Sequence, residues 1–159
     1  MKIGDKLPTV PVQRLVDGDV QQINLVEFSA GKTILLVAVP GAFTPTCSDD
    51  HVPGYLSNIE AIRDQGVDEV VILAASDFFV VKAWADQLQP KPHLHFMADG
   101  SQTFAAAAGQ TFDLTDHGLG VRTQRYAALV RDGIVERFSV ESDPTAVSIS
   151  GAAEMLQTI

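Results

Sequence analysis

Continuous apolar runs alternate with segments of helical character along most of the chain. Residues Thr33–Val39 and Glu69–Ala75 are apolar and rich in β-branched side chains, so the sequence predicts two strands buried on both faces. A helix is predicted between them over Thr46–Arg63, with Gln65-Gly66 as its stop and a kink at Pro53. Because a helix between two buried strands is typical of a parallel pair, this region predicts an open α/β sheet with helices on both faces.

An Asp-Gly pair indicates a β-hairpin in the last third of the chain. Asp132-Gly133 separates Tyr126–Arg131 from Ile134–Val140, and this dipeptide between two β-type runs is typical of a tight turn. Further predicted elements are strands at Val10–Val16 and Leu94–Ala98, a helical turn between Asn24 and Gly31, a helix capped by Asp77 and ending at Leu88, a short helix capped by Ser101 and ended by Gly109, and a last helix at Gly151–Thr158. The sequence therefore predicts the α/β class and a thioredoxin-like fold, in which helices flank a mixed central β-sheet.

Composition and charge narrow the class of protein. The 159 residues fit a single domain over residues 1–159. The 20 acidic and 11 basic residues give a net charge of −9, which disfavours binding to nucleic acids and anionic membrane surfaces. The longest apolar run, Thr33–Phe43, is shorter than the roughly 20 residues that cross a bilayer, and the N-terminus has no apolar signal segment. We therefore expect a cytoplasmic protein with no nucleic-acid or membrane partner.

The chain has one cysteine, Cys47, which excludes an intramolecular disulfide and a zinc site built on several cysteines. Cys47 follows the predicted strand Thr33–Val39 and lies in the first turn of the next helix, with Thr44 as the expected N-cap and Pro45 as the first helical residue. The N–H groups and the dipole of a helix N-terminus stabilise a thiolate. Because polar residues flank the cysteine, a reactive thiol is favoured over an inert buried one.

The segment around the cysteine resembles the active-site signature of the peroxiredoxins. It reads Pro-Gly-Ala-Phe-Thr-Pro-Thr-Cys-Ser over residues 40–48 and His-Val-Pro-Gly-Tyr over residues 51–55, a form that resembles the type-II, or atypical, subfamily. Other stretches that resemble this subfamily are Gly66–Glu69, Phe79–Trp84, Gln124–Tyr126, the hairpin Val130–Val135 and Glu141–Thr145. The resemblance covers essentially the whole chain and implies thiol-dependent reduction of hydrogen peroxide and organic hydroperoxides.

The resemblance also assigns roles to individual residues. It implies that Cys47 is the nucleophile that peroxide oxidises to sulfenic acid, that Thr44 is its hydroxyl partner and that Pro40 shapes the floor of the pocket. The other residues implied for the substrate pocket are Gly41, Phe43, Pro45 and Thr46. No metal ion or organic cofactor is implied.

Arg125, within Gln124–Tyr126, matches the active-site arginine of the family. Its guanidinium and the backbone N–H groups of the loop would stabilise both the thiolate and the charge that develops on the leaving oxygen. The residues alone leave Arg122 and Arg131 as equal candidates, since any of the three arginines is most simply interpreted as a solvated surface charge. The choice of Arg125 therefore depends on the resemblance.

The chain lacks the second, resolving cysteine that occurs in this subfamily. Matching by eye places that cysteine at Ile72 or Ile149, and neither isoleucine can form a disulfide. The resemblance then implies that an external thiol, either glutathione with glutaredoxin or thioredoxin, reduces the oxidised Cys47. Ser76 stands where an asparagine is usual, and we expect a helix cap there. Tyr126 replaces the usual phenylalanine.

Other functions are compatible with a reactive cysteine. A peroxide sensor that relays oxidation to a partner protein would use the same thiolate with little turnover. His51, four residues after Cys47, would allow a Cys-His hydrolase, but hydrolases usually hold their base on another element. His93 and His95 share one strand face, a pattern that strand-edge histidines explain better than a metal site.

A cluster of aromatic residues has two interpretations. Phe78, Phe79 and Trp84 begin the helix after Asp77, and they either pack into the core or form the interface of a homodimer. In the second case Phe43 of the active-site loop would face the same way. We expect a homodimer from this pattern.

Overall fold

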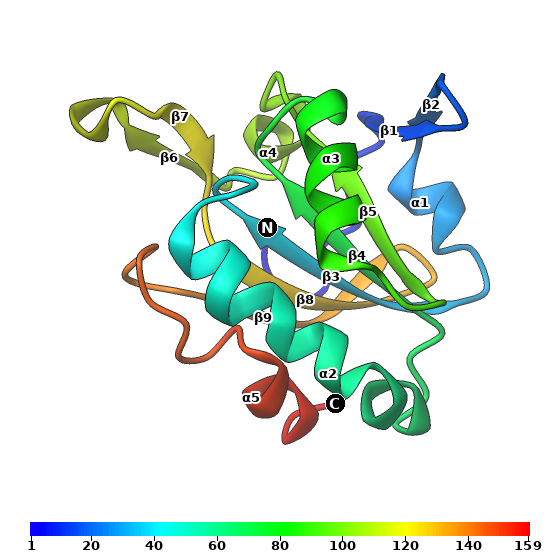
Figure 1. The fold of residues 1–159 in the computed structure, drawn as a ribbon. Coiled ribbons are helices and arrows are strands. Elements are labelled where there is room, and N and C mark those ends of the chain that lie inside the picture. Colours follow the sequence, from blue (N-terminus) through cyan, green and yellow to red (C-terminus); the bar gives the residue numbers. More distant parts are fainter.

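The central strands of the sheet are the buried apolar runs that the sequence predicts. The computed structural model describes residues 1–159. β3 (Thr33–Val39) pairs in parallel with β4 (Glu69–Ala74), and β4 pairs in parallel with β5 (Leu94–Ala98). Antiparallel strands complete a seven-stranded sheet in the order β2-β1-β5-β4-β3-β8-β9 (Figure 1). The predicted α/β class and the mixed central sheet are confirmed.

Helices cover both faces of this sheet, as predicted. One face packs against α2 (Val52–Asp64), α3 (Phe78–Leu88) and α5 (Ala152–Leu156), and the other against α1 (Leu25–Phe28) and α4 (Thr103–Ala107) (Figure 1). None of the helices combines the length and the apolar character that crossing a membrane requires. The outer strands are β1 (Val12–Val16), β2 (Asp19–Ile23), β8 (Tyr126–Arg131) and β9 (Ile134–Val140).

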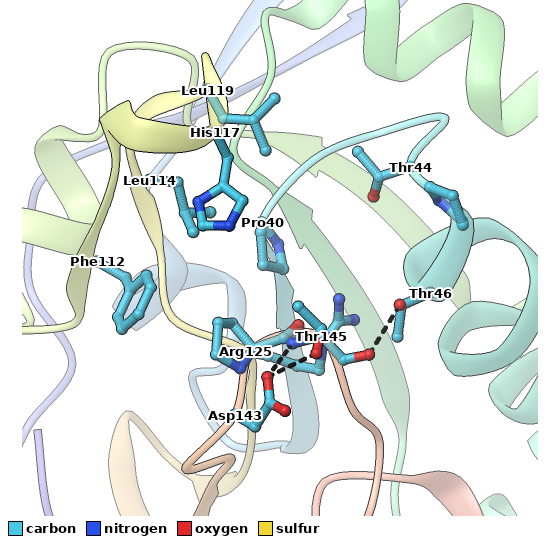
Figure 2. A pocket seen from close by; sticks show the side chains of 12 residues that line it. Pro40, Thr44, Thr46, Phe112, Leu114, His117, Leu119, Arg125, Asp143 and Thr145 are labelled. Atoms are coloured by element: carbon cyan, nitrogen blue, oxygen red, sulfur yellow. Dashed lines mark hydrogen bonds between the residues drawn. The ribbon is translucent and has the colours of Figure 1, made fainter.

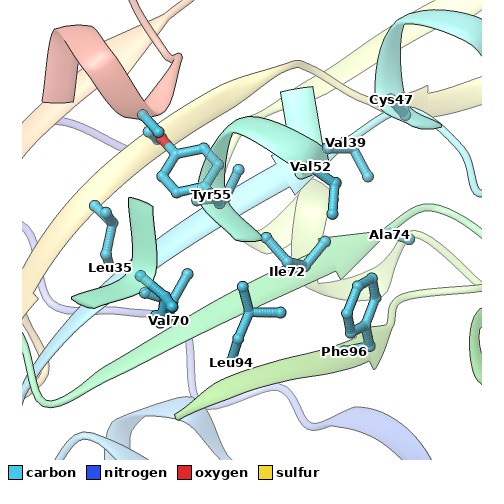
Figure 3. Packing of buried hydrophobic residues seen from close by; sticks show 14 of the residues in the cluster. Leu35, Val39, Cys47, Val52, Tyr55, Val70, Ile72, Ala74, Leu94 and Phe96 are labelled. Atoms are coloured by element: carbon cyan, nitrogen blue, oxygen red, sulfur yellow. The ribbon is translucent and has the colours of Figure 1, made fainter. Parts of the chain in front are cut away.

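Alternate residues of β3 point into two separate apolar cores, because successive side chains of a strand face opposite ways. Leu35 and Val39 pack with residues of α2 and α3, in the core drawn in Figure 3. Ile34 and Leu36 pack on the opposite face with residues of α1 and α4. Cys47 belongs to the first core and lies at its edge, beyond the C-terminal end of β3. The sheet thus fixes the sulfur at the edge where the parallel strands end.

The predicted helix over Thr46–Arg63 consists of two helices of different type. Thr46–His51 forms a π-helix, and α2 follows it directly. Pro53 is the second residue of α2, where its missing N–H removes no hydrogen bond within that helix. The proline therefore stands at the point where the wider π-helix changes to a regular α-helix.

Turn and cap residues account for the other agreements and differences. Asp132 and Gly133 both have positive φ angles, as the predicted tight turn between β8 and β9 requires. Asp77 caps α3 as predicted, since its Oδ1 accepts from the N–H of Val80 at 3.0 Å. The predicted cap of α4 at Ser101 is wrong. The carboxylate of Asp99 accepts the N–H groups at the start of this helix instead, at distances of 2.8 and 3.2 Å.

The hairpin that follows α4 has no counterpart in the predicted elements. β6 (Thr111–Leu114) and β7 (Gly120–Thr123) pair with each other in a separate two-stranded sheet. A 3₁₀ turn at Thr115–His117 follows β6. Figure 1 shows this hairpin projecting from the body of the protein above β3. It lies close to the C-terminal ends of the parallel strands and takes part in the site described below.

The two tyrosines provide a test of how buried hydroxyl groups affect stability. Both side chains are fully buried, but the Tyr55 hydroxyl donates to the carbonyl of Ser150 at 2.6 Å whereas the Tyr126 hydroxyl has no partner. An unpaired buried hydroxyl costs roughly 1–3 kcal/mol, and a hydrogen bond contributes about 1 kcal/mol. We therefore expect Tyr126→Phe to leave the free energy of unfolding unchanged or to raise it. Tyr55→Phe should lower it by about 1 kcal/mol.

Urea denaturation followed by circular dichroism would measure both variants against the unmodified protein. Each variant loses one oxygen atom from the same residue type, so Tyr55→Phe is the matched control. A loss of stability in Tyr126→Phe as large as that in Tyr55→Phe would contradict the prediction.

Candidate active site

Cys47 is fully buried in the π-helix that follows the loop at the end of β3. The loop turns sharply at Phe43, which has a φ angle of 59°. The N–H of Ser48 donates to the carbonyl of Thr44 at 2.9 Å and so closes the first turn after the loop. Trp84 donates its indole N–H to the Ser48 hydroxyl at 2.9 Å, which fastens this turn to α3. The cysteine is therefore held in place from both sides.

Arg125 is the arginine that the structure brings to the cysteine. Its Nη2 donates to the Cys47 sulfur at 3.2 Å, and its side chain is only 2% exposed. Arg131, in contrast, is exposed and pairs with Glu136. No carboxylate forms an ion pair with Arg125. Because a nearby buried cation favours a thiolate, this contact supports a nucleophilic sulfur.

His51 holds the guanidinium in this position. The Nη1 of Arg125 lies 3.0 Å from His51 Nδ1, and the His51 Nε2 lies 2.9 Å from the carbonyl oxygen of Ser150. An arginine can only donate, so Nδ1 accepts and the ring proton is on Nε2. Burial and the neighbouring Arg125 charge outweigh the bond to Ser150 and lower the pKa of His51 to about 4. Both nitrogens are engaged away from the sulfur, which argues against a Cys-His hydrolase.

Glu141 organises the loop that supplies the partner of His51. Its carboxylate accepts five hydrogen bonds, at 2.6–2.9 Å, from backbone and hydroxyl groups of residues 148–150. Burial alone would raise the pKa of Glu141, but the bonds from Ser148 and Ser150 lower it to about 2. Glu141 begins the family-like stretch Glu141–Thr145, but the sequence predicts no role for it. The sequence feature that could have indicated this role is an acidic residue a few positions before a segment with two serines, Ser148 and Ser150.

The hydroxyl of Thr44 does not cap the helix as predicted. Its Oγ1 donates to the carbonyl of Gly41 at 2.8 Å, and the π-helix has no side-chain cap. The carbonyl of Gly41 lies three residues earlier in the same tight loop, and it accepts the hydroxyl proton of Thr44. The single O–H proton of Thr44 is thus donated to Gly41 and not to the Cys47 sulfur, and its role as hydroxyl partner stays a prediction.

A cavity of about 400 Å³ opens beside these groups (Figure 2). The residues predicted for the site that line it are Pro40, Thr44, Pro45, Thr46 and Arg125. Other lining residues, which sequence reasoning missed, are Phe112, Leu114, His117 and Leu119 of the β6–β7 hairpin and its turn, and Asp143–Thr145. Figure 2 shows Pro40 between the hairpin residues and Thr46.

Two predicted pocket residues do not line this cavity. Gly41 is a buried residue of the loop itself, and an added Cβ would lie 3.0 Å from Nη1 of Arg122. Phe43 points outward and is 49% exposed. The positive φ angle of Phe43 turns its side chain away from the loop that forms the pocket wall.

Ser76 does not cap α3. Its hydroxyl accepts from the N–H of Ala42 at 3.1 Å and so supports the active-site loop.

The histidines at positions 93 and 95 belong to a different part of the molecule. His93 and His95 both bond to Glu69 Oε2, at 3.3 and 2.8 Å. Burial tends to raise the pKa of Glu69, but the two histidines lower it overall. They lie near the N-terminal ends of β4 and β5, opposite the edge that holds Cys47. Only His95 belongs to β5, because His93 precedes the strand with a positive φ angle; the two rings share the Glu69 carboxylate and not one strand face.

Comparison with known proteins agrees with this geometry. Residues 2–156 match the family model described as Redoxin. Peroxiredoxin-2C of Oryza sativa subsp. japonica is 39% identical over 159 residues, covering 99% of this chain and 97% of that protein. Reduced Prx3 from Vibrio vulnificus in complex with hydrogen peroxide has a TM-score of 0.92 and 34% identity, covering 99% of this chain and 95% of that one. A Plasmodium falciparum antioxidant protein, a 1-Cys peroxiredoxin, has a TM-score of 0.91 and 28% identity, covering 99% and 98% of the two chains.

The fold and the site define a thiol-based redox protein of thioredoxin-like architecture. The chain belongs to the peroxiredoxins, the thiol peroxidases within the Redoxin family, and its single cysteine fits a one-cysteine variant of the type-II kind. The resemblance noted in the sequence is confirmed.

The buried His51 predicts a pH dependence of stability. In the unfolded chain this histidine gains a proton as the pH falls through about 6.5, whereas in the folded protein it does so only near pH 4. The unfolded state therefore binds more protons between these values, and the free energy of unfolding falls as the pH is lowered from 6.5 to 4. The expected loss is up to about 3 kcal/mol.

Unfolding measured in urea at several pH values between 4 and 7 would test this. His51→Gln should show a smaller loss over this range than the unmodified protein. His117→Gln is the matched control, because His117 is exposed and should leave the dependence unchanged. Equal slopes for all three proteins would contradict the prediction.

Proposed function

We propose that this peroxiredoxin reduces hydrogen peroxide and organic hydroperoxides with Cys47 as nucleophile, and that an external thiol reduces the oxidised cysteine. The observation that supports this most directly is the contact between the Arg125 guanidinium and the Cys47 sulfur, beside a pocket lined by Pro40, Thr44 and Arg125.

In the first step the Cys47 thiolate attacks the terminal oxygen of the hydroperoxide. An S–O bond forms while the O–O bond breaks, and the sulfur is oxidised to sulfenic acid. The other oxygen leaves as hydroxide or alkoxide and takes a proton to become water or alcohol. Arg125 donates toward the charge that develops, and a donor of this kind contributes about 3–4 kcal/mol. The Thr44 hydroxyl accepts from the peroxide proton.

The apolar side of the pocket supports organic hydroperoxides as substrates. Phe112, Leu114 and Leu119 face the cavity that also contains Pro40 and Arg125 (Figure 2). An alkyl or aryl group would be removed from water against these side chains, and that burial is favourable. Hydrogen peroxide has no such group and would use only the polar end of the pocket.

The sequence supports an external reductant because no second cysteine exists. Ile72, one predicted position of a resolving cysteine, is buried in β4, and Ile149, the other, is exposed on the loop before α5. In the second step an external thiol would attack the sulfenic acid and release water as a mixed disulfide forms. A second thiol would then release Cys47. Glutathione with glutaredoxin and thioredoxin are the two reductants we propose.

Turnover assays separate this function from its alternative. The reduced protein should be oxidised by hydrogen peroxide much faster than a free thiol, as measured by competition with a reference scavenger. It should then sustain turnover with glutathione and glutaredoxin or with thioredoxin and its reductase. Fast oxidation without turnover in either system would favour a peroxide sensor that passes oxidation to a partner protein.

Two variants serve as controls for this assay. Cys47→Ser should abolish oxidation, and Arg125→Met should slow it by about 10²–10³-fold because one charged donor is lost. Oxidation of the unmodified protein at the rate of an ordinary cysteine would overturn the proposal.

We also propose that two copies of the chain form a homodimer. Phe79 and Val121 are 65% and 51% exposed, and Val80, Leu119 and Val121 line one hollow beside Ala42. Exposed apolar side chains gathered in this way are typical of protein interfaces. Trp84, in contrast, is buried in the core, so the predicted aromatic cluster is divided between core and surface.

Light scattering at micromolar concentration should give the mass of a dimer. Phe79→Glu should shift the protein toward monomer, because a charge at an apolar interface is unfavourable. Ile3→Glu is the matched control, since Ile3 is 61% exposed on the N-terminal segment beside β9. A monomer mass for the unmodified protein would contradict the proposal.

A further inference from the structure

The β6–β7 hairpin has few connections to the rest of the protein. Its strands pair only with each other. At its base, the carbonyl of Gln110 accepts from the N–H of Gln124 at 2.8 Å and from the Thr123 hydroxyl at 3.3 Å. Figure 1 shows that the hairpin extends well beyond this base. Something else must therefore fix the distance between the hairpin and the active-site loop.

Arg122, on β7, makes that connection. Its Nη1 donates to the carbonyl of Pro40 at 3.1 Å and to the carbonyl of Ala75 at 2.9 Å. Its Nε donates to the carbonyl of Leu119 at 2.7 Å, within the hairpin itself. Apart from the bonds at the base, these two bonds of Nη1 are the hydrogen bonds that join the hairpin to the body. Arg122 is thus not the solvated surface charge that the sequence suggests.

The neighbouring residues leave room for this guanidinium. A Cβ atom at Gly41 would lie 3.0 Å from Nη1 of Arg122, so a larger residue there would push the guanidinium by a few tenths of an ångström. Pro40 and Ala75 follow β3 and β4 directly, and both carbonyls lie at the edge where these strands end. One arginine therefore ties together the ends of two parallel strands and the hairpin.

The hairpin fixed in this way forms the apolar side of the reaction pocket. Phe112, Leu114 and Leu119 line the cavity with Pro40, the residue whose carbonyl Arg122 holds. The nucleophile is supported separately, because Arg125 bonds to His51, to the carbonyl of Pro144 and to the Cys47 sulfur. The positions of the apolar side and of the reacting groups thus depend on different side chains.

We propose that Arg122 is a positioning residue that sets the preference for organic hydroperoxides by holding the hairpin over the pocket. This inference rests on the proposed peroxidase function. A hydroperoxide with a bulky organic group contacts the hairpin, whereas hydrogen peroxide does not reach it. Loss of Arg122 therefore weakens the reaction of the bulky substrate more than the reaction of hydrogen peroxide.

The test compares the second-order rate constants for Cys47 oxidation by cumene hydroperoxide and by hydrogen peroxide. Trp84 is the only tryptophan and donates to Ser48 beside the cysteine, so its fluorescence in stopped flow can follow the reaction. Arg122→Met should lower the rate constant for cumene hydroperoxide by about tenfold or more, the scale of lost apolar contacts in a pocket. The rate constant for hydrogen peroxide should change by less than about threefold.

Two further variants keep the test decisive. Arg122→Lys, which retains the charge but offers a point donor in place of a fork, should give an intermediate ratio of the two rate constants. Arg137→Met removes the same charge from an exposed position on β9 and should leave the ratio unchanged. Thermal unfolding establishes that each variant is folded, and Arg122→Lys alone decides the test if Arg122→Met does not fold.

The possible outcomes distinguish this inference from the proposed function. If the unmodified protein reacts slowly with both hydroperoxides, the proposed function fails. Two other results would overturn the inference when the unmodified protein reacts fast. In one, the Arg122 variants lower the rate constants for both hydroperoxides by the same factor; in the other, they lower neither. Either result would show that Arg122 does not set the substrate preference.

Discussion

Arg125 is a cation held inside the protein with a single potential anion in contact, the sulfur of Cys47. Its other partners are the carbonyl of Pro144 and the imidazole of His51, and neither carries a negative charge. Removing a charge from water without a counter-ion costs on the order of several kcal/mol. A thiolate at Cys47 would therefore supply the counter-ion that the buried arginine otherwise lacks, just as the arginine would stabilise the thiolate.

No carboxylate around this pair forms an ion pair with the guanidinium; Asp143, in the same cavity, has its pKa lowered mainly by bonds from Thr145 and in addition by the charge of Arg125. Glu141 is ionised, but its oxygens are occupied by the serine-rich loop over residues 148–150. Asp49 and Asp50, which precede His51 in the π-helix, are exposed to solvent, where water screens their charge. His51 stays neutral and accepts from Arg125. The loop, the histidine and the arginine thus form one continuous support for the sulfur.

The parts that the sequence predicts well are those that depend on burial and on local turns. The apolar runs of β3 and β4, the turn at Asp132-Gly133 and the place of Cys47 after β3 all follow from residue type and spacing. Arg125 could be chosen only through its family resemblance, since its partners lie on distant segments of the chain. The π-helix was missed because its residues fit an α-helix equally well.

Arg122 and the β6–β7 hairpin were missed for a related reason. Each strand of the hairpin has only four residues, so the alternation of polar and apolar side chains in Thr111–Leu114 is too short to predict a strand by itself. The partners of Arg122 are backbone carbonyls, which carry no residue identity for a sequence pattern to reveal. Pro40 is where the two arginines meet: it lines the pocket with Arg125, while its carbonyl is held by Arg122. Changes confined to the hairpin can thus alter substrate preference without disturbing the sulfur, which Arg125 and His51 support separately.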